Sequence, residues 1–141
     1  NKVRQVAEHV ALWHSVDRAS LGAEIARRRP GAAVLAQVNT SREPTKGGCA
    51  PEATGELVAA LRGHGLDVRG LMTVAEPGVG ARACFRLLRD LADDLDLPER
   101  SMGMTDDLED AVAEGATIVR VGTALFGPRA HPPTSPEPTA G

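Results

Sequence analysis

Aromatic residues, lysines and cysteines are all scarce in this chain of 141 residues. It has no Tyr, one Trp and two Phe, so its core has to be built from Leu, Val, Ile and Ala. The two cysteines, Cys49 and Cys84, form no Cys-x-x-Cys pair and have no His at metal-ligand spacing, which argues against a zinc site or a disulfide framework. Two reduced thiols are typical of a cytoplasmic protein, and we expect that location.

Long hydrophobic runs and an excess of positive charge are also missing. The stretch 2–16 mixes Arg4, Glu8 and His9 into its apolar positions, so it has neither a signal-peptide core nor a membrane span of about 20 apolar residues. The 16 Lys and Arg residues are outnumbered by 19 Asp and Glu residues, and no basic face carries aromatic residues. We therefore expect neither a membrane nor a nucleic acid as partner.

Apolar segments of strand and helix character alternate along the chain, whose 42% hydrophobic content is enough for one domain. The strand-like segments are short, continuous apolar runs, which are typical of a parallel sheet covered by helices. The predicted strands are 12–16, 33–39, 68–74, 100–102 and 117–121. Helices are expected at 3–10, 18–29, 52–64, 81–95 and 123–126. This is an α/β pattern of five βα units, three fewer than an eight-stranded barrel needs.

One further helix has a clear predicted start and stop. Asp106 is a plausible N-cap with Glu109 three residues later, and Gly115 ends the helix. Its expected buried stripe is Leu108, Ala111 and Val112. From residue 130 the chain is rich in Pro and polar residues, so we expect a disordered tail over 130–141.

Two strand-to-helix corners carry Gly and hydroxyl residues: Ser101-Met102-Gly103 and Gly122-Thr123. Such corners point backbone N–H groups outward, and the following helix adds the positive end of its dipole, so an anion is favoured there. Ser and Thr at these positions also cap helices, and capping uses the same N–H groups. Arg120 lies between the corners, where it could bind a ligand or form a buried ion pair with Asp or Glu.

Other candidate residues favour plainer interpretations. Asp106 and Asp107 could form an acid/base pair, but carboxylates at a helix start are usually caps. Lys46-Gly47-Gly48 lacks the order of residues that a Walker phosphate loop requires. The histidines His9, His14 and His64 are not at metal-ligand spacing, and we assign them structural or surface roles.

The two corners and several earlier segments closely resemble one family in order and spacing. They are Ser101-Met-Gly-Met-Thr-Asp-Asp, Arg120-Val-Gly-Thr-Ala-Leu-Phe-Gly, His14-Ser-Val-Asp17, Gln37-Val-Asn39 and Arg69-Gly-Leu-Met72. Over residues 1–129 the chain resembles the pyridoxal phosphate homeostasis protein family, also called the YggS or PROSC family. The resemblance implies a (β/α)₈ TIM-barrel-type fold like the N-terminal domain of alanine racemase. It also implies that pyridoxal 5′-phosphate (PLP) is bound as an imine to a lysine at the end of the first strand.

Matched to this family, residues 1–129 would be a partial barrel containing strands four to eight. The imine-forming lysine has no counterpart, because Lys2 and Lys46 match other family positions. We expect such a partial barrel to leave two sheet edges open, to aggregate and to bind PLP weakly and reversibly. The full-length protein is expected to be a monomer.

The resemblance also implies the roles of the site residues. The corner residues Ser101, Met102, Gly103, Gly122 and Thr123 would hold the phosphate of PLP, and Arg120 would face its pyridine nitrogen. Barrels of this type commonly bind phosphate after strands seven and eight, which agrees with these corners.

The implied function is non-enzymatic: binding PLP, keeping free PLP low and supplying PLP-dependent apo-enzymes. One alternative is an amino-acid racemase-like PLP enzyme on the same barrel, and another is a truncated, non-functional fragment. A racemase needs a second acid/base group opposite its lysine and usually another domain. This chain has no Tyr, and we expect only a short tail after its last helix. Racemase turnover that scales with PLP content would favour the enzyme.

Overall fold

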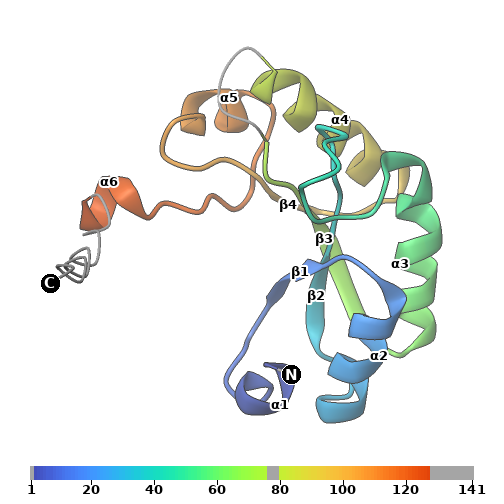
Figure 1. Ribbon diagram of the computed structural model, residues 1–141. Coiled ribbons are helices and arrows are strands. Elements are labelled where there is room, and N and C mark those ends of the chain that lie inside the picture. The colour runs from blue at the N-terminus through green and yellow to red at the C-terminus, as the bar shows by residue number, and fades with distance from the viewer. Residues whose placement is uncertain (1, 76–79, 128–141) are drawn as a thin grey trace, which may run out of the picture.

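A parallel four-stranded sheet with sequential strand order is the centre of the computed structural model, which describes residues 2–75 and 80–127 (Figure 1). Its strands are β1 (Trp13–Val16), β2 (Ala33–Gln37), β3 (Asp67–Met72) and β4 (Glu99–Ser101). The order β1-β2-β3-β4 places each strand beside the next one in the sequence. Because all pairs are parallel, the carboxyl ends of the strands share one edge of the sheet.

Helices connect the strands and pack along the same side of the sheet (Figure 1). They are α2 (Ala19–Arg28), α3 (Thr54–Gly63) and α4 (Ala81–Asp94), with a short helix α1 (Val3–Val6) before β1 and a 3₁₀ turn η1 (Pro51–Ala53) before α3. A doubly wound sheet would carry helices on both faces. Sequential strands with helices on one side are the arrangement of a (β/α) barrel, so the predicted TIM-barrel-type fold is confirmed as a partial barrel.

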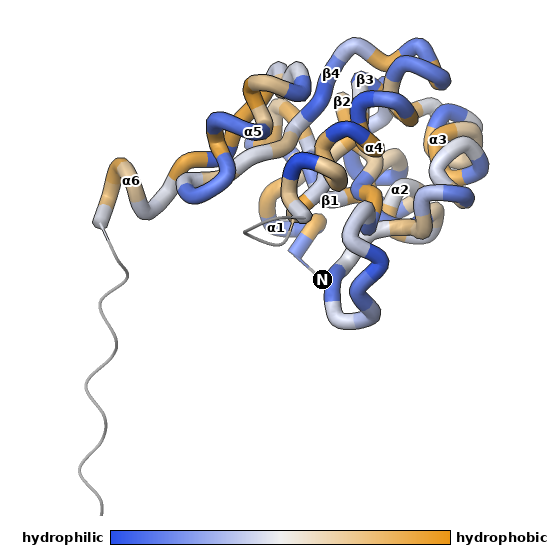
Figure 2. The backbone as a smooth tube through the Cα atoms, turned by 90° about the horizontal axis from the view of Figure 1, so that it is seen from above, coloured by the Kyte–Doolittle hydropathy of each residue, from blue (hydrophilic) through white to orange (hydrophobic). Residues whose placement is uncertain are grey.

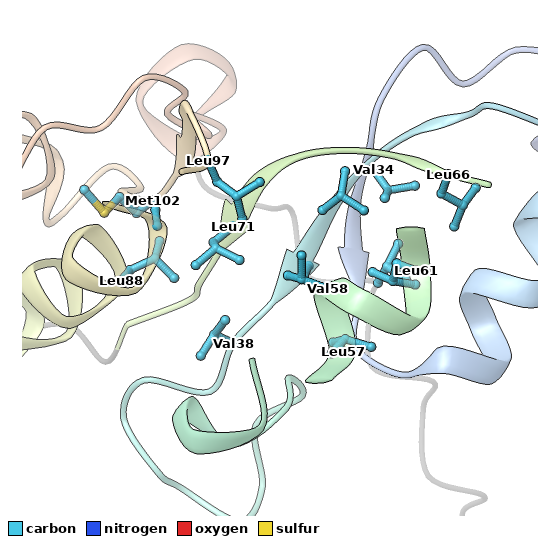
Figure 3. Packing of buried hydrophobic residues seen from close by; sticks show 14 of the residues in the cluster. Val34, Val38, Leu57, Val58, Leu61, Leu66, Leu71, Leu88, Leu97 and Met102 are labelled. Carbon is cyan, nitrogen blue, oxygen red and sulfur yellow. The ribbon is translucent and has the colours of Figure 1, made fainter. Parts of the chain in front are cut away.

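The core lies between the sheet and these helices and is aliphatic, as the scarcity of aromatic residues predicts. Figure 3 shows Val34 and Leu71 of the sheet facing Val58 and Leu61 of α3 and Leu88 of α4. Four of these five side chains are completely inaccessible to solvent, and the exposed fraction of Val58 is 2%. The continuous apolar run of β2 is buried from Ala33 to Ala36, which explains why it shows no polar alternation.

Helix α5 (Leu108–Ala113) begins later than predicted and buries a narrower stripe. Asp107, not Asp106, occupies the N-cap position. Val112 is 60% exposed, so its assignment to the buried stripe is wrong. Helix α5 contacts α4, and its buried positions are Ala111 and the C-cap residue Glu114, whereas Val112 points away from this buried face. The predicted end is confirmed: Gly115 adopts φ +85° and the Ala116 N–H donates to the Ala111 carbonyl, a Schellman ending.

The predicted fifth strand over 117–121 is wrong as a regular strand. This segment forms one parallel bridge, Ser101 with Ile118, and the Arg120 N–H donates to the Gly103 carbonyl. Gly103 has φ +93°, and this left-handed residue interrupts the regular register, so the pairing does not extend into a strand among the described residues. The segment therefore returns along the edge of β4 without becoming a strand.

Helix α6 (Thr123–Phe126) has the predicted bounds but lies away from the sheet and the other helices (Figures 1 and 2). Leu125 and Phe126 are 71% and 86% exposed. The predicted disordered tail over 130–141 lies outside the described residues. Among the helices that the structure describes, none has the length and apolar character needed to cross a membrane, and residues 2–75 and 80–127 contain no His, Cys, Asp and Glu cluster suited to a metal ion.

Three arginines on one face of α4 join this helix to α5 through a single buried carboxylate. Glu114 Oε1 accepts hydrogen bonds from Arg82 Nε at 2.7 Å and Arg86 Nη2 at 3.3 Å, and its Oε2 accepts one from Arg89 Nη1 at 2.6 Å. The exposed fraction of the Glu114 side chain is 3%. This cluster fixes α5, and with it the chain that follows Gly103.

Replacing Glu114 by Gln is expected to lower the melting temperature at neutral pH. The hydrogen bond from Arg82 and the positive charges of Arg86 and Arg89 hold the pKa of Glu114 below its ordinary value of 4.5. This stabilisation is therefore present above pH 4.5 and is lost as the pH falls through the lowered pKa. Thermal unfolding of the full-length gene product, followed by circular dichroism at a series of pH values from 7 downwards, should show a deficit at pH 7 that shrinks as the pH falls below 4.5. The exposed Glu109→Gln is the control, and a Glu114→Gln melting temperature equal to wild type at pH 7 would contradict the interpretation.

Candidate functional site

The carboxyl ends of β3 and β4 and the segment after Ile118 meet around one guanidinium group, that of Arg120. Its Nη1 donates a hydrogen bond to Ser101 Oγ at 2.8 Å, and its Nη2 donates to the Thr73 carbonyl at 2.7 Å. Thr73 is itself fixed, because its buried hydroxyl donates to the Val38 carbonyl at 2.8 Å. Arg120 is thus held by residues that follow or end two different strands.

Arg120 forms no ion pair with a carboxylate in the part of the chain that the structure describes. Burial lowers the pKa of its guanidinium, and the more distant charge of Asp107 acts in the opposite direction. A guanidinium nevertheless remains protonated in a protein. The alternative of a buried ion pair is therefore not observed among these residues, and the group remains a half-buried cation with hydrogen atoms available to a ligand.

Ser101 is buried and is not among the residues that line the hollow around Arg120 described below. Its hydroxyl lies 2.9 Å from His14 Nδ1 in addition to its bond with Arg120. Burial lowers the pKa of His14, and the positive charge of Arg120 lowers it further. Ser101 therefore connects Arg120 with a histidine of β1.

The rest of the first corner is shaped by packing. The Met102 side chain is completely buried in the core beside Leu88 (Figure 3). Gly103 adopts φ +93°, and a Cβ atom at this position would lie 2.4 Å from the Ala111 Cβ. Asp107 turns inward, where its Oδ1 accepts the Met104 N–H at 2.6 Å. The carboxylate of Asp107 thus orders the corner locally, but it makes no side-chain cap hydrogen bond to α5, so the expected capping by this carboxylate is not observed.

The second corner is open. Gly122 is exposed, and a Cβ atom built on it would have no neighbour within 4 Å. Together with Thr105, Arg120 and Thr123 it lines a surface hollow of about 780 Å³. A volume of this size is in the usual range for small-molecule sites.

Thr105 and His14 are residues that sequence reasoning missed. Thr105 lines the large hollow and two adjoining ones, and its Oγ1 accepts the Ala124 N–H at 3.4 Å, which connects the two corners. A hydroxyl residue two positions after the corner glycine was the available signal for Thr105. His14 gave no such signal, because its partner Ser101 is 87 residues away.

The structure therefore brings most of the predicted site residues together, but some of them are accessible to a ligand and others are buried. Arg120, Gly122 and Thr123 line the hollow. Ser101 contacts Arg120 from below the surface, and Gly103 accepts the Arg120 N–H through its carbonyl. The Met102 side chain faces the core.

Comparisons with known proteins agree with this fold. The family model "Alanine racemase, N-terminal domain" matches residues 1–130. The pyridoxal phosphate homeostasis proteins of Pseudomonas aeruginosa and Aquifex aeolicus are 46% identical over 139 residues and 43% identical over 145 residues. These matches cover 92% and 93% of this chain but 60% and 64% of the two relatives. The chain thus spans about three-fifths of the length of these curated relatives.

Solved structures of PipY from Synechococcus elongatus give the same result. The structure without PLP has a TM-score of 0.79 at 37% identity, and the structure with PLP bound has a TM-score of 0.76 at 34% identity. Each match covers 90% of this chain and 66% of PipY. The chain therefore belongs to the alanine racemase N-terminal domain family, and its resemblance to the pyridoxal phosphate homeostasis proteins within that family is confirmed.

Proposed function

We propose that this chain supplies the phosphate and ring-nitrogen sides of a PLP site in a non-catalytic protein of intracellular PLP homeostasis. The single observation that carries this proposal is Arg120, a half-buried cation held by Ser101 and Thr73 without a carboxylate partner among the described residues. The names of the relatives and the PLP bound to PipY support the choice of ligand.

Arg120 is chemically suited to a carrier. Its guanidinium only donates hydrogen bonds and does not release a proton at physiological pH. A ring nitrogen that accepts a hydrogen bond from Arg120 therefore stays unprotonated. PLP supplies an electron sink to enzymes that use it, and this sink is weaker when its ring nitrogen carries no proton. Arg120 thus favours binding of the cofactor without catalysis.

The second corner fits a phosphate better than the first does. Gly122 leaves space for a close approach to its backbone, and Thr123 and Thr105 place hydroxyl-bearing residues on the same hollow. At the first corner the Ser101 hydroxyl is engaged by Arg120 and His14, and the Met102 side chain is in the core. We propose that Gly122, Thr123 and Thr105 contact the phosphate, that the backbone of Met102 and Gly103 shapes the site, and that Ser101 acts through Arg120.

The covalent part of the site is proposed to lie in the portion of the relatives that this chain does not match. Lys46 lines a smaller hollow with Thr105 and Thr123, but its ammonium is paired with Glu43 at 2.8 Å. The partners proposed for the whole protein are PLP-dependent apo-enzymes in the cytoplasm. The two unpaired thiols of Cys49 and Cys84 suit that compartment.

The proposal is tested with the protein expressed from its complete reading frame. We expect it to retain PLP through purification, to show one lysine modified by PLP after borohydride reduction, and to pass PLP to an apo-enzyme without racemase turnover of its own. A full-length protein that neither retains nor takes up PLP would refute the proposal. Racemase turnover proportional to PLP content would show that the protein is an enzyme.

Arg120→Met should weaken PLP binding by about tenfold in this protein, since it removes a charge-assisted hydrogen bond of the size expected for an ionised donor. Methionine keeps the length and apolar stem of the side chain, so the loss reports on the guanidinium. Equilibrium titration followed by absorbance gives the Kd. Arg62→Met, on the exposed face of α3, is the matched control and should bind PLP as wild type does. Equal affinities of the two variants would show that Arg120 does not contact the cofactor.

A further inference from the structure

The hydroxyl of Ser101 is the meeting point of two nitrogen-bearing side chains, and their chemistry decides the direction of the hydrogen bonds. Arg120 Nη1 is 2.8 Å from Ser101 Oγ and His14 Nδ1 is 2.9 Å from it. A guanidinium can only donate, so Ser101 Oγ accepts from Arg120. Its own hydrogen atom is then free to be donated, and His14 Nδ1 is the acceptor within reach.

This arrangement selects one form of His14. To accept from Ser101, Nδ1 has to be unprotonated, so the imidazole is neutral and carries its hydrogen on Nε2. The opposite direction would make Ser101 Oγ accept two hydrogen bonds and leave its own hydroxyl hydrogen without a partner in a fully buried position, which is costly. Burial and the charge of Arg120, both of which lower the pKa of His14, favour the same neutral form.

We propose that His14 is a positioning residue that acts through Ser101 to fix the orientation of the Arg120 guanidinium, in a directed chain from Arg120 to Ser101 to His14. The proposal concerns the site described above and rests on its proposed function for the meaning of that orientation. Two of the five N–H hydrogens of Arg120 are used by Ser101 and Thr73. The chain determines where the remaining hydrogens point.

The chain adds a side-chain anchor to the backbone bond that the Arg120 N–H makes with the Gly103 carbonyl. The segment 117–121 is not a regular strand and is bridged to the sheet through Ser101 and Ile118. His14, in contrast, belongs to β1, and β1 is paired with β2 in the sheet. The hydrogen bonds through Ser101 therefore hold the Arg120 side chain in place against β1.

The tautomer of His14 is measurable without any ligand. Nitrogen-15 NMR of the imidazole groups in the PLP-free full-length protein should show His14 as the neutral form with hydrogen on Nε2, assigned by the signal that disappears in His14→Asn. A hydrogen on Nδ1, or a charged imidazolium at pH 7.5, would overturn the proposal.

A double-mutant cycle tests the positioning role through PLP affinity. His14→Leu and Ser101→Ala should each weaken binding by about three- to tenfold, the size expected for one hydrogen bond. His14→Asn offers an amide oxygen in place of Nδ1 and should restore affinity to within about twofold. Because both residues act through one chain, the double variant should bind no more weakly than the worse single variant. His64→Leu, at the exposed end of α3, is the control and should not change the affinity.

The two proposals fail differently. Additive losses in the cycle, or an unchanged affinity in His14→Leu, would overturn the positioning role while PLP binding stands. A wild-type protein that binds no PLP would refute the proposed function, and the NMR result would then decide alone whether the directed chain exists.

Discussion

Replacing Gly70 by Ala is expected to destabilise the protein by about 3 kcal/mol or more, a large part of the stability of an ordinary domain. Gly70 lies in β3 directly opposite Glu99 of β4. A Cβ atom on Gly70 would lie 2.0 Å from the Glu99 carbonyl oxygen and 2.5 Å from its Cβ. The Glu99 oxygen is backbone, so relief of this overlap requires the two strands to separate.

Separation of β3 from β4 at Gly70 would also displace residues of the candidate site. The register continues from Gly70 opposite Glu99 to Met72 opposite Ser101, and Ser101 is one of the two anchors of Arg120. We therefore expect Gly70→Ala to lose both denaturant resistance and PLP retention in the full-length product. Chemical denaturation measures the first and absorbance of bound PLP the second.

The control for Gly70 is Gly63→Ala in α3. Gly63 is exposed, and a Cβ atom there would meet nothing within 4 Å. This substitution should be neutral or should stabilise by up to about 1 kcal/mol, because alanine is the better helix former. Similar free energies of unfolding for the two variants would show that β3 and β4 do not pack as described.

The glycines of the two corners are expected to respond in opposite ways to the same substitution. Gly103→Ala should cost about 2–4 kcal/mol, since it combines a backbone conformation that alanine disfavours with an overlap in a packed core. The overlap is with the Ala111 Cβ, 2.4 Å from the added atom. Gly122 has φ −115° and open space around it, so Gly122→Ala should change stability by less than about 0.5 kcal/mol.

Gly122→Ala, although it should barely change stability, is expected to weaken PLP binding. A methyl group on this residue stands where the proposed phosphate approaches the backbone, and we expect about a tenfold loss of PLP affinity. Urea denaturation and PLP titration of the two variants in the full-length product provide both measurements. A Gly122→Ala protein with wild-type affinity would place the phosphate elsewhere, and a Gly103→Ala protein with wild-type stability would contradict the packing of α5.

Helix ends could be predicted from the sequence, because neighbouring residues determine them. Gly115 ends α5 because it provides a left-handed residue at the point where the last carbonyl groups need partners. The bounds of α6 were equally readable from Gly122 and from Gly127, which has φ +75°. A continuous apolar run predicted β2, which is buried from Ala33 to Ala36.

Features that depend on a distant partner could not be read in this way. The segment 117–121 has the composition of a strand, but the left-handed conformation of Gly103 interrupts the regular pairing with the chain that follows β4. Val112 fits the helical period of α5, yet the face that is buried is decided by the arginines of α4 around Glu114. His14 was assigned a structural or surface role because its sequence neighbourhood does not reveal Ser101.

The three residues around Arg120 also have a consequence for how the protein reaches its native state. Contacts from Arg120 reach 19 residues back to Ser101 and 47 residues back to Thr73, and Ser101 reaches a further 87 residues back to His14. Contacts between residues so distant in the sequence slow folding, because the entropy of closing long loops is lost before these contacts are made. A ligand that recognises the oriented guanidinium therefore requires β1 and β4 to be in place, because they carry His14 and Ser101, and we expect its binding to report on correct folding.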